Sequence, residues 1–242
     1  MHRLLVTLRS ARVTSLMYVG ALIAMGMFAP AASADETVTI GGSSAVLLGP
    51  KSPRASIILV PGGNGAIHPG PNGDIYGLTG NQLVRTRHAY AARGNAVLVV
   101  DAGVNLAEAV DYMARIKRPV TVVATSRGTI RAAEGIAQGA RPDALVLTSG
   151  FLTGESGSPT NVVGILGSPS KLPRTLVIHH RDDTCRVTQP AGVAPFIQWA
   201  AGRARVAWLS GGVSTGDPCE AFAHHGFNGQ DGSVVSLAAG FH

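Results

Sequence analysis

The sequence predicts an α/β fold in which helices cover both faces of a mostly parallel sheet. Short runs of Val, Ile, Leu and Ala recur along the chain, and helix-length segments separate them. Strands that are buried on both faces read as continuous apolar runs, and such burial is typical of a parallel sheet. Strands that alternate with helices in this way indicate a doubly wound arrangement.

The elements are expected in a simple order along the chain. A hairpin spans residues 37–48, with Gly41-Gly42 at its turn. Six strands form the core of the sheet, at 56–60, 96–100, 120–124, 144–148, 175–178 and 206–209. Helices are predicted at 81–93, 106–116, 129–138, 191–201 and 233–241. Because no repeat or long linker interrupts this series, residues 35–242 are expected to form one domain.

Residues 1–34 have the pattern of a secretory signal peptide. Three arginines and no acidic residue lie in the first 12 positions, an apolar run covers 16–28, and Ala32-Ser33-Ala34 resembles a cleavage site. The apolar run is shorter than the roughly 20 residues that span a bilayer, which favours cleavage after Ala34 over an anchor. We therefore expect an exported protein, periplasmic or secreted, with no stable membrane association after the signal is removed.

The charge balance does not favour a nucleic-acid partner. The chain has 20 Lys and Arg residues against 14 Asp and Glu residues. Three of the basic residues lie in the first 34 positions, so the remainder carries 17 against 14, a formal charge of +3. No basic stripe with interleaved aromatic residues occurs, and single-strand binding requires such a stripe.

A strand-to-helix junction in the middle of the chain carries the sharpest motif. The strand expected at 120–124 runs into Ala124-Thr125-Ser126-Arg127-Gly128 and then directly into a helix. This approximates the G-x-S-x-G nucleophile elbow, with Ala124 in place of the first glycine and Gly128 at the second. A serine that caps a helix N-terminus would occupy the same junction, so the motif leaves both interpretations open.

An acidic pair and a histidine pair follow downstream. Asp182 and Asp183 come after the strand expected at 175–178, while His224 and His225 precede a Gly-Phe pair near the end of the chain. The order Ser, Asp, His is that of α/β-hydrolase triads. With these motifs the chain resembles the α/β-hydrolase superfamily, particularly its small dienelactone-hydrolase-like and esterase-like members, over essentially all of the sequence after residue 34.

The resemblance implies a role for each side chain. In such proteins the acid loop often reads H-G-x-x-D and the histidine often precedes Gly-Phe, which makes Asp183 the acid and His225 the base. His225 would take the proton of the Ser126 hydroxyl, and Asp183 would hold the other ring nitrogen. Nothing intrinsic to either pair decides between Asp182 and Asp183, or between His224 and His225.

Donors for an oxyanion are expected from two places. One is the backbone N–H of Arg127, the residue after the serine. The other is the loop at 61–65, which reads PGGNG and follows the first core strand. Its glycines allow the backbone to turn its amides inward. Gly63 is the expected second donor, and Asn64 is the next candidate.

Cys185 and Cys219 are the two cysteines of the chain. In an exported protein an even pair favours a disulfide over a metal site or free thiols. Cys185 lies two residues after Asp183, and Cys219 lies six residues before His225. The bond would therefore tie the acid loop to the histidine loop.

Two other kinds of site are disfavoured. The segment at 63–68 nearly matches a G-x-G-x-x-G dinucleotide fingerprint, but His68 replaces the third glycine and Asp101 lies beyond the usual spacing. The His, Asp and Cys residues around the acid and the base have no known zinc-motif spacing. No cofactor and no metal are expected.

The predicted activity is hydrolysis of a carboxylic ester through an acyl-enzyme on Ser126, and thioester or amide hydrolysis would use the same groups. The alternative is a non-catalytic binding protein of the same fold. No separate cap domain is expected, because the segment at 151–173 is short and rich in Gly, Ser and Pro, with residues 162–166 to line a pocket. His68, Tyr76 and Phe227 are candidates for the walls of that pocket, with ordinary packing as the alternative interpretation of each.

Overall fold

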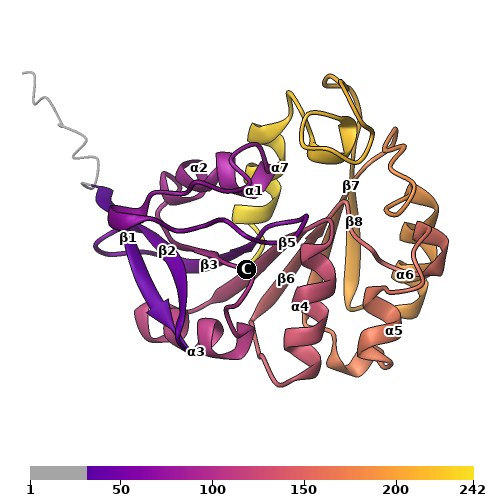
Figure 1. Ribbon diagram of the computed structural model, residues 1–242. Helices are drawn as coiled ribbons and strands as arrows, with labels where there is room; N and C mark the ends of the chain where they lie inside the picture. Colours follow the sequence, from indigo (N-terminus) through magenta and orange to yellow (C-terminus); the bar gives the residue numbers. More distant parts are fainter. Residues whose placement is uncertain (1–31) are drawn as a thin grey trace, which may run out of the picture.

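The computed structural model describes residues 32–242, so the expected signal segment lies almost entirely outside the described residues (Figure 1). The sheet has eight strands in the order β1-β2-β4-β3-β5-β6-β7-β8. The strands are β1 (Ala32–Ile40), β2 (Ser43–Pro50), β3 (Ala55–Val60), β4 (Asn95–Val100), β5 (Val120–Thr125), β6 (Ala144–Thr148), β7 (Arg174–His180) and β8 (Ala204–Leu209). Pairing is antiparallel between β1, β2 and β4, and parallel from β4 to β8.

The central strands are buried on both faces, as their apolar sequences predict. Every residue of β3, β4, β5 and β6 is buried. Successive side chains point to opposite faces, so Ile58 and Val60 pack into one core while Ile57 and Leu59 pack into the other. The predicted doubly wound sheet is confirmed.

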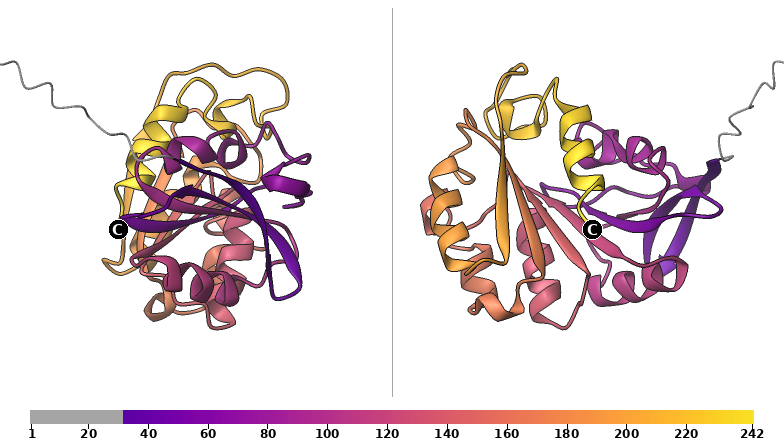
Figure 2. Two further views of the ribbon diagram at one scale, coloured as in Figure 1. Left: turned by 90° about the vertical axis from the view of Figure 1, so that its left-hand side faces the viewer. Right: turned by 180° about the vertical axis from the view of Figure 1, so that it is seen from behind.

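Helices cover both faces of the sheet (Figures 1 and 2). One face carries α3 (Leu106–Ile116), α4 (Gly128–Ala137), α5 (Val162–Leu166) and α6 (Val193–Trp199); the other carries α1 (Gln82–Arg85), α2 (Arg87–Ala91) and α7 (Asp231–Ala239). None of these helices has the length and apolar character that a bilayer crossing requires, within the part of the chain described.

The single helix predicted at 81–93 is wrong in one respect, because it is two short helices. The break is at Thr86, which leaves the helical conformation at φ −100° and ψ 2°. Its hydroxyl donates a hydrogen bond to the carbonyl of Gln82 at 2.6 Å. A threonine side chain that bonds to the preceding turn competes with the backbone ladder, which accounts for the interruption.

Candidate active site

Ser126 lies in a strained turn between β5 and α4. Its φ is 53°, a left-handed value that is uncommon for residues other than glycine. Its N–H donates to the carbonyl of Thr148 on β6, and its own carbonyl accepts from the N–H of Thr129, both at 2.9 Å. These two bonds hold the serine at the carboxyl edge of the sheet with its side chain partly exposed.

The backbone around this turn is packed so closely that two glycines are required. A Cβ on Gly128 would lie 2.3 Å from the carbonyl oxygen of Val60 and 2.6 Å from that of Pro61. A Cβ on Gly62 would lie 2.9 Å from the Cβ of Ser126. The turn after β3 therefore lies directly against the turn that carries the serine.

Asp183 lies in the turn after β7, and its side chain is fully buried. The carboxylate accepts a hydrogen bond from the N–H of Cys185 at 2.9 Å through Oδ1. Its Oδ2 lies 3.1 Å from Nδ1 of His225 and accepts a hydrogen bond from the hydroxyl of Thr188 at 3.2 Å. The Thr188 hydroxyl also lies 3.0 Å from the same ring nitrogen, so it contacts both Asp183 and His225 and helps to hold them together.

His225 is positioned through its backbone as well as its ring. The buried hydroxyl of Ser149, just beyond the end of β6, donates to the carbonyl of His225 at 2.7 Å. The imidazole and Ser126 line the same pocket. Within the described residues no hydrogen bond joins the Ser126 hydroxyl to His225. Contacts between a nucleophile and its base are often longer without ligand and shorten when substrate binds.

The neighbouring residues Asp182 and His224 face a different direction. The Asp182 side chain is 64% exposed, and its backbone carbonyl lies 3.2 Å from Nδ1 of His224. The ring of His224 stacks on that of His180, with centroids 4.3 Å apart. His180, Asp182 and His224 bring their ligand atoms within 4.8 Å of one another. Both ring nitrogens of His180 already have partners, the N–H of Asp182 and the carbonyl of Gly211, so the cluster is not preformed for a metal.

The pocket that holds Ser126 and His225 has a volume of about 390 Å³. Its walls come from the turns and loops after β3, β5, β6 and β7, from the segment before α1, and from the loop around His225. The lining residues are Gly62, Gly63, Leu78, Gly80, Asn81, Gln82, Thr125, Ser126, Arg127, Phe151, Val187, Cys219, Glu220, Ala221, Phe222, His225 and Gly226. Arg127 and Glu220 place opposite charges at its rim.

Among the predicted oxyanion donors, Arg127 and Gly63 line this pocket, whereas Asn64 does not. The Asn64 side chain is instead used in a local turn, in which its Oδ1 accepts from the N–H of Ala66 at 3.0 Å. Gly62, which the sequence did not single out, lines the pocket next to Ser126. Within residues 32–242, the N–H groups of Gly62, Gly63 and Arg127 donate to no other group, so they are available to a ligand.

None of the three candidate wall residues lines this pocket. His68 is exposed and Tyr76 is 68% exposed, while Phe227 is buried in the core beneath α7. The segment predicted to line the pocket forms α5, whose Val162 and Leu166 are buried in the core on the α4 side of the sheet. The segment at 219–222 supplies the wall instead, because the disulfide holds it over the site.

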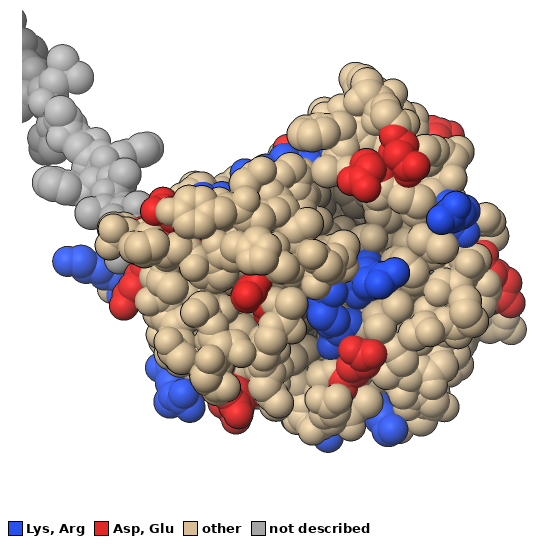
Figure 3. All heavy atoms as spheres, viewed as in Figure 1, with Lys and Arg blue, Asp and Glu red and all other residues tan. Residues whose placement is uncertain are grey.

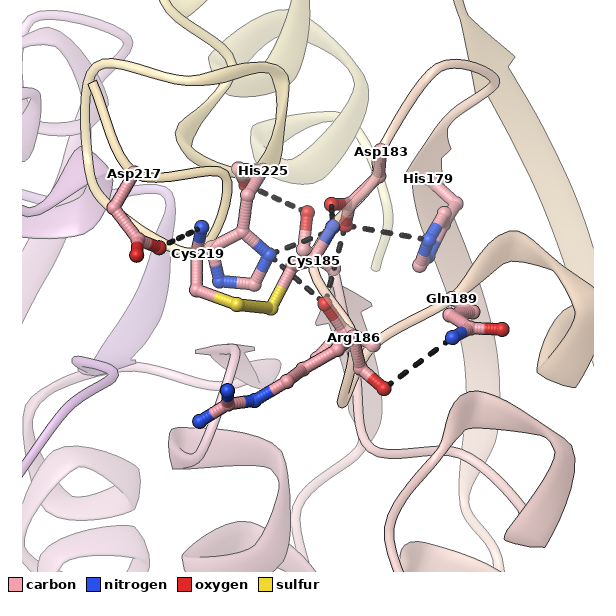
Figure 4. The surroundings of a disulfide bond; sticks show 10 residues. His179, Asp183, Cys185, Arg186, Gln189, Asp217, Cys219 and His225 are labelled. Atoms are coloured by element: carbon pink, nitrogen blue, oxygen red, sulfur yellow. Dashed lines mark hydrogen bonds and ion pairs between the residues drawn. A yellow bond between two sulfur atoms is a disulfide. The ribbon is translucent and has the colours of Figure 1, made fainter. Parts of the chain in front are cut away.

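The predicted disulfide between Cys185 and Cys219 is present (Figure 4). It joins the loop of Asp183 to the loop of His225, and the view shows the bond lying beside the His225 ring. The N–H of Cys219 is itself held by the carboxylate of Asp217 at 2.8 Å. The covalent bond therefore connects the two loops whose side chains must meet.

A second buried histidine lies on the far side of the carboxylate. The Nε2 of His179 lies 3.6 Å from Oδ2 of Asp183 (Figure 4). The ring of His179 also packs edge-on against Trp208. Burial lowers the pKa of His179 to about 4, an effect that the charge of Asp183 opposes in part. His179 is therefore neutral near pH 7.

Neither a protein-family profile nor a curated protein sequence matches the chain. Solved structures match it as a fold. An esterase from Pyrococcus furiosus is 12% identical, with a TM-score of 0.57 over 84% of this chain and 86% of its own. The esterase domain of a Rhodothermus marinus protein is 13% identical, with a TM-score of 0.53 over 87% and 98%. A thioesterase domain from the curacin biosynthetic pathway is 12% identical, with a TM-score of 0.50 over 86% and 99%. The chain has the α/β-hydrolase fold.

Proposed function

We propose that this chain is a serine hydrolase that cleaves carboxylic esters through an acyl-enzyme on Ser126. The observation that carries the proposal is the meeting of three distant segments at one pocket. A serine in a strained strand-to-helix turn shares the pocket with His225, whose Nδ1 lies 3.1 Å from the buried carboxylate of Asp183. A helix-capping serine would need neither partner.

In the proposed mechanism the ring nitrogen of His225 that faces the pocket takes the proton of the Ser126 hydroxyl. The serine oxygen then attacks the ester carbonyl, and the developing negative charge falls on the carbonyl oxygen. The free N–H groups of Arg127 and of the Gly62-Gly63 turn are suited to stabilise that charge. The protonated ring returns its proton to the leaving alcohol, and water repeats the sequence to release the acid.

Asp183 supports this cycle through charge and orientation. Its carboxylate accepts a hydrogen bond from the Nδ1–H of His225. The ring proton is thereby held on Nδ1, and the opposite nitrogen is left without a proton and able to act as a base. The same negative charge stabilises the imidazolium that forms during attack. Burial strengthens both effects, because the pair is shielded from water.

The dimensions of the pocket favour small substrates. A volume of about 390 Å³ lies near the lower end of the roughly 300–1,000 Å³ usual for small-molecule sites. Leu78, Phe151 and Phe222 supply apolar surface for a short acyl or alcohol group. We expect p-nitrophenyl acetate and butyrate to be better substrates than long-chain esters. The same groups would also cleave thioesters, and one of the structural neighbours is a thioesterase domain.

We also infer that the protein acts outside the cytoplasm. Disulfides persist in oxidising compartments, and the bond between Cys185 and Cys219 lies beside the active site. The signal-peptide pattern of residues 1–34 points the same way. Detection of the processed chain in a periplasmic or culture-medium fraction, with Asp35 at its N-terminus, tests this inference.

A fluorophosphonate probe tests the mechanism. Wild-type protein is expected to be labelled and to hydrolyse p-nitrophenyl acetate, whereas Ser126→Ala is expected to do neither. Ser158→Ala is the matched control, because Ser158 is a partly exposed serine outside the pocket, and its hydroxyl donates only to the nearby carbonyl of Thr160. Labelling of Ser126→Ala at the wild-type level would contradict the proposal. An unlabelled, inactive wild type would favour a non-catalytic binding protein.

A further inference from the structure

The guanidinium of Arg131 is bound to the loop that faces Ser126. Arg131 lies on α4, and its Nη1 donates to the carbonyl of Gly63 at 3.3 Å. Its Nη2 donates to the carbonyl of Gly62 at 3.3 Å and also to that of Pro61. One side chain therefore holds three consecutive carbonyls of the turn after β3.

The contact of Arg131 with these carbonyls also fixes the direction of the N–H groups in the same peptide bonds. In a planar trans peptide the carbonyl and the following N–H point in opposite directions. Because the carbonyls of Pro61 and Gly62 face Arg131, the N–H groups of Gly62 and Gly63 face away from it. Both glycines line the pocket, and Gly62 lies directly against Ser126. Their N–H groups are thus aimed at the space where an ester carbonyl would react.

Two further observations indicate that the site is built around the guanidinium. A Cβ on Gly65, which has φ 79°, would lie 2.7 Å from Cζ of Arg131, so the loop leaves room for the group by having glycine there. Burial lowers the pKa of Arg131, and the charge of Arg127 lowers it further. Partial removal from water strengthens hydrogen bonds from a charged donor.

We propose that Arg131 is a positioning residue of the oxyanion hole, holding the carbonyls of Pro61, Gly62 and Gly63 so that the N–H groups of Gly62 and Gly63 point at the reacting carbonyl. The proposal rests on the serine-hydrolase function argued above. The positive charge also polarises these peptide groups, which makes their N–H groups better donors. Figure 3 shows basic side chains gathered in the hollow of this face, above the N-terminal end of α4.

The test compares Arg131→Gln and Arg131→Lys with a matched control on the same helix–loop unit. Arg141 also donates to backbone carbonyls, those of Ile136 at 3.1 Å and Ala140 at 2.9 Å, but it lies at the other end of α4. Arg141→Gln therefore removes a similar structural contact without touching the loop at 61–63. Thermal unfolding of each variant shows whether it is folded before kinetics are measured.

Removal of one oxyanion donor costs about 10²–10³ in kcat, and misaiming donors should cost less. We expect Arg131→Gln to lower kcat for p-nitrophenyl acetate by roughly 10- to 100-fold with KM within about twofold. Arg131→Lys should recover part of the loss, because it retains the charge and one donor position. Arg141→Gln should retain wild-type kcat.

Inhibitor binding separates an oxyanion role from a general structural one. A trifluoromethyl ketone forms a charged tetrahedral adduct with the serine, whereas the matching amide binds without reacting. Arg131→Gln should weaken the ketone by about the same factor as kcat and leave the amide unchanged. Equal weakening of both inhibitors, or wild-type kcat, would overturn the proposal for Arg131. A wild-type protein that no fluorophosphonate labels would instead contradict the hydrolase function itself.

Discussion

The carboxylate of Asp183 lies 3.1 Å from Nδ1 of His225, although 42 positions separate the two residues in the sequence. Both side chains are almost completely buried, and the Thr188 hydroxyl contacts both. Contact between a buried carboxylate and an imidazole fixes the ring orientation and the position of its proton. Substitutions of Asp183 and of the two cysteines beside this pair should therefore change the activity in specific ways.

Asp183→Asn should abolish most activity while leaving the fold intact. The amide keeps an oxygen for the N–H of Cys185, but its NH₂ group would favour the wrong tautomer of His225. A comparable change in a serine triad lowers kcat by about 10⁴-fold, and a similar loss is expected here on p-nitrophenyl acetate. Asp182→Asn is the control, since that carboxylate is 64% exposed, and it should remain within about twofold of wild type. A large loss in Asp182→Asn with an active Asp183→Asn would reverse the assignment.

The Cys185→Ser/Cys219→Ser double variant should lose activity under conditions where the sheet is still folded. The bond closes a loop with a sequence separation of 34, for which loop entropy predicts at most about 4 kcal/mol of stabilisation. Its loss also frees the acid loop from the histidine loop. We expect kcat/KM to fall at temperatures below the unfolding transition measured by circular dichroism. Wild-type kcat/KM of the double variant at those temperatures would contradict this prediction.

Gly128→Ala should destabilise the serine turn strongly. The added Cβ would lie 2.3 Å and 2.6 Å from two backbone oxygens, and neither can move without displacing β3. Overpacking of this kind costs about 1–3 kcal/mol, and urea titration of unfolding measures it. Gly232→Ala in α7 is the control, because nothing lies within 4 Å of its added Cβ. That change should be neutral or raise stability by up to about 1 kcal/mol. Equal stability of the two variants would show that the turn is not as crowded as its geometry implies.

The free energy of unfolding should fall as the pH drops below 6.5, the pKa of an unperturbed histidine, and His179 accounts for part of this fall. In the folded protein the pKa of His179 is about 4, against 6.5 for an unperturbed histidine. Above pH 6.5 neither state is protonated, so His179 adds no pH dependence. Between pH 6.5 and 4 only the unfolded state takes up the proton, which lowers the free energy of unfolding by at most about 1.4 kcal/mol per pH unit.

His179→Phe should remove this part of the dependence of the free energy of unfolding on pH, and it keeps an aromatic ring against Trp208. Urea unfolding at pH 7 and pH 5 measures the difference for wild type and variant. His88→Asn serves as the control, because His88 is 58% exposed on the surface. A slope in His179→Phe as steep as that of wild type would show that other groups carry the acid sensitivity.

Local sequence determined the strands and the serine turn of this protein. The four central strands are apolar throughout because both of their faces are covered, so the pattern needs no knowledge of neighbours. The turn at Ser126 is also visible as a local motif, although the crowding that requires Gly128 comes from the distant carbonyls of Val60 and Pro61. The sequence does not predict the break in the helix at 81–93, because the conformation of Thr86 depends on a side-chain hydrogen bond that hydrophobic periodicity does not reveal.

Only the tertiary structure decided which carboxylate meets which imidazole and what surrounds them. Asp182 and Asp183 are adjacent in a turn and project in different directions, as do His224 and His225, and those directions follow from packing between loops that are distant in sequence. The contacts of Thr188, Ser149 and Arg131 likewise join positions that no short motif relates. The sequence by itself shows which reactive groups are present and which segments have the periodicity of strands or helices. The direction of a side chain in a loop depends instead on which distant segment packs against it.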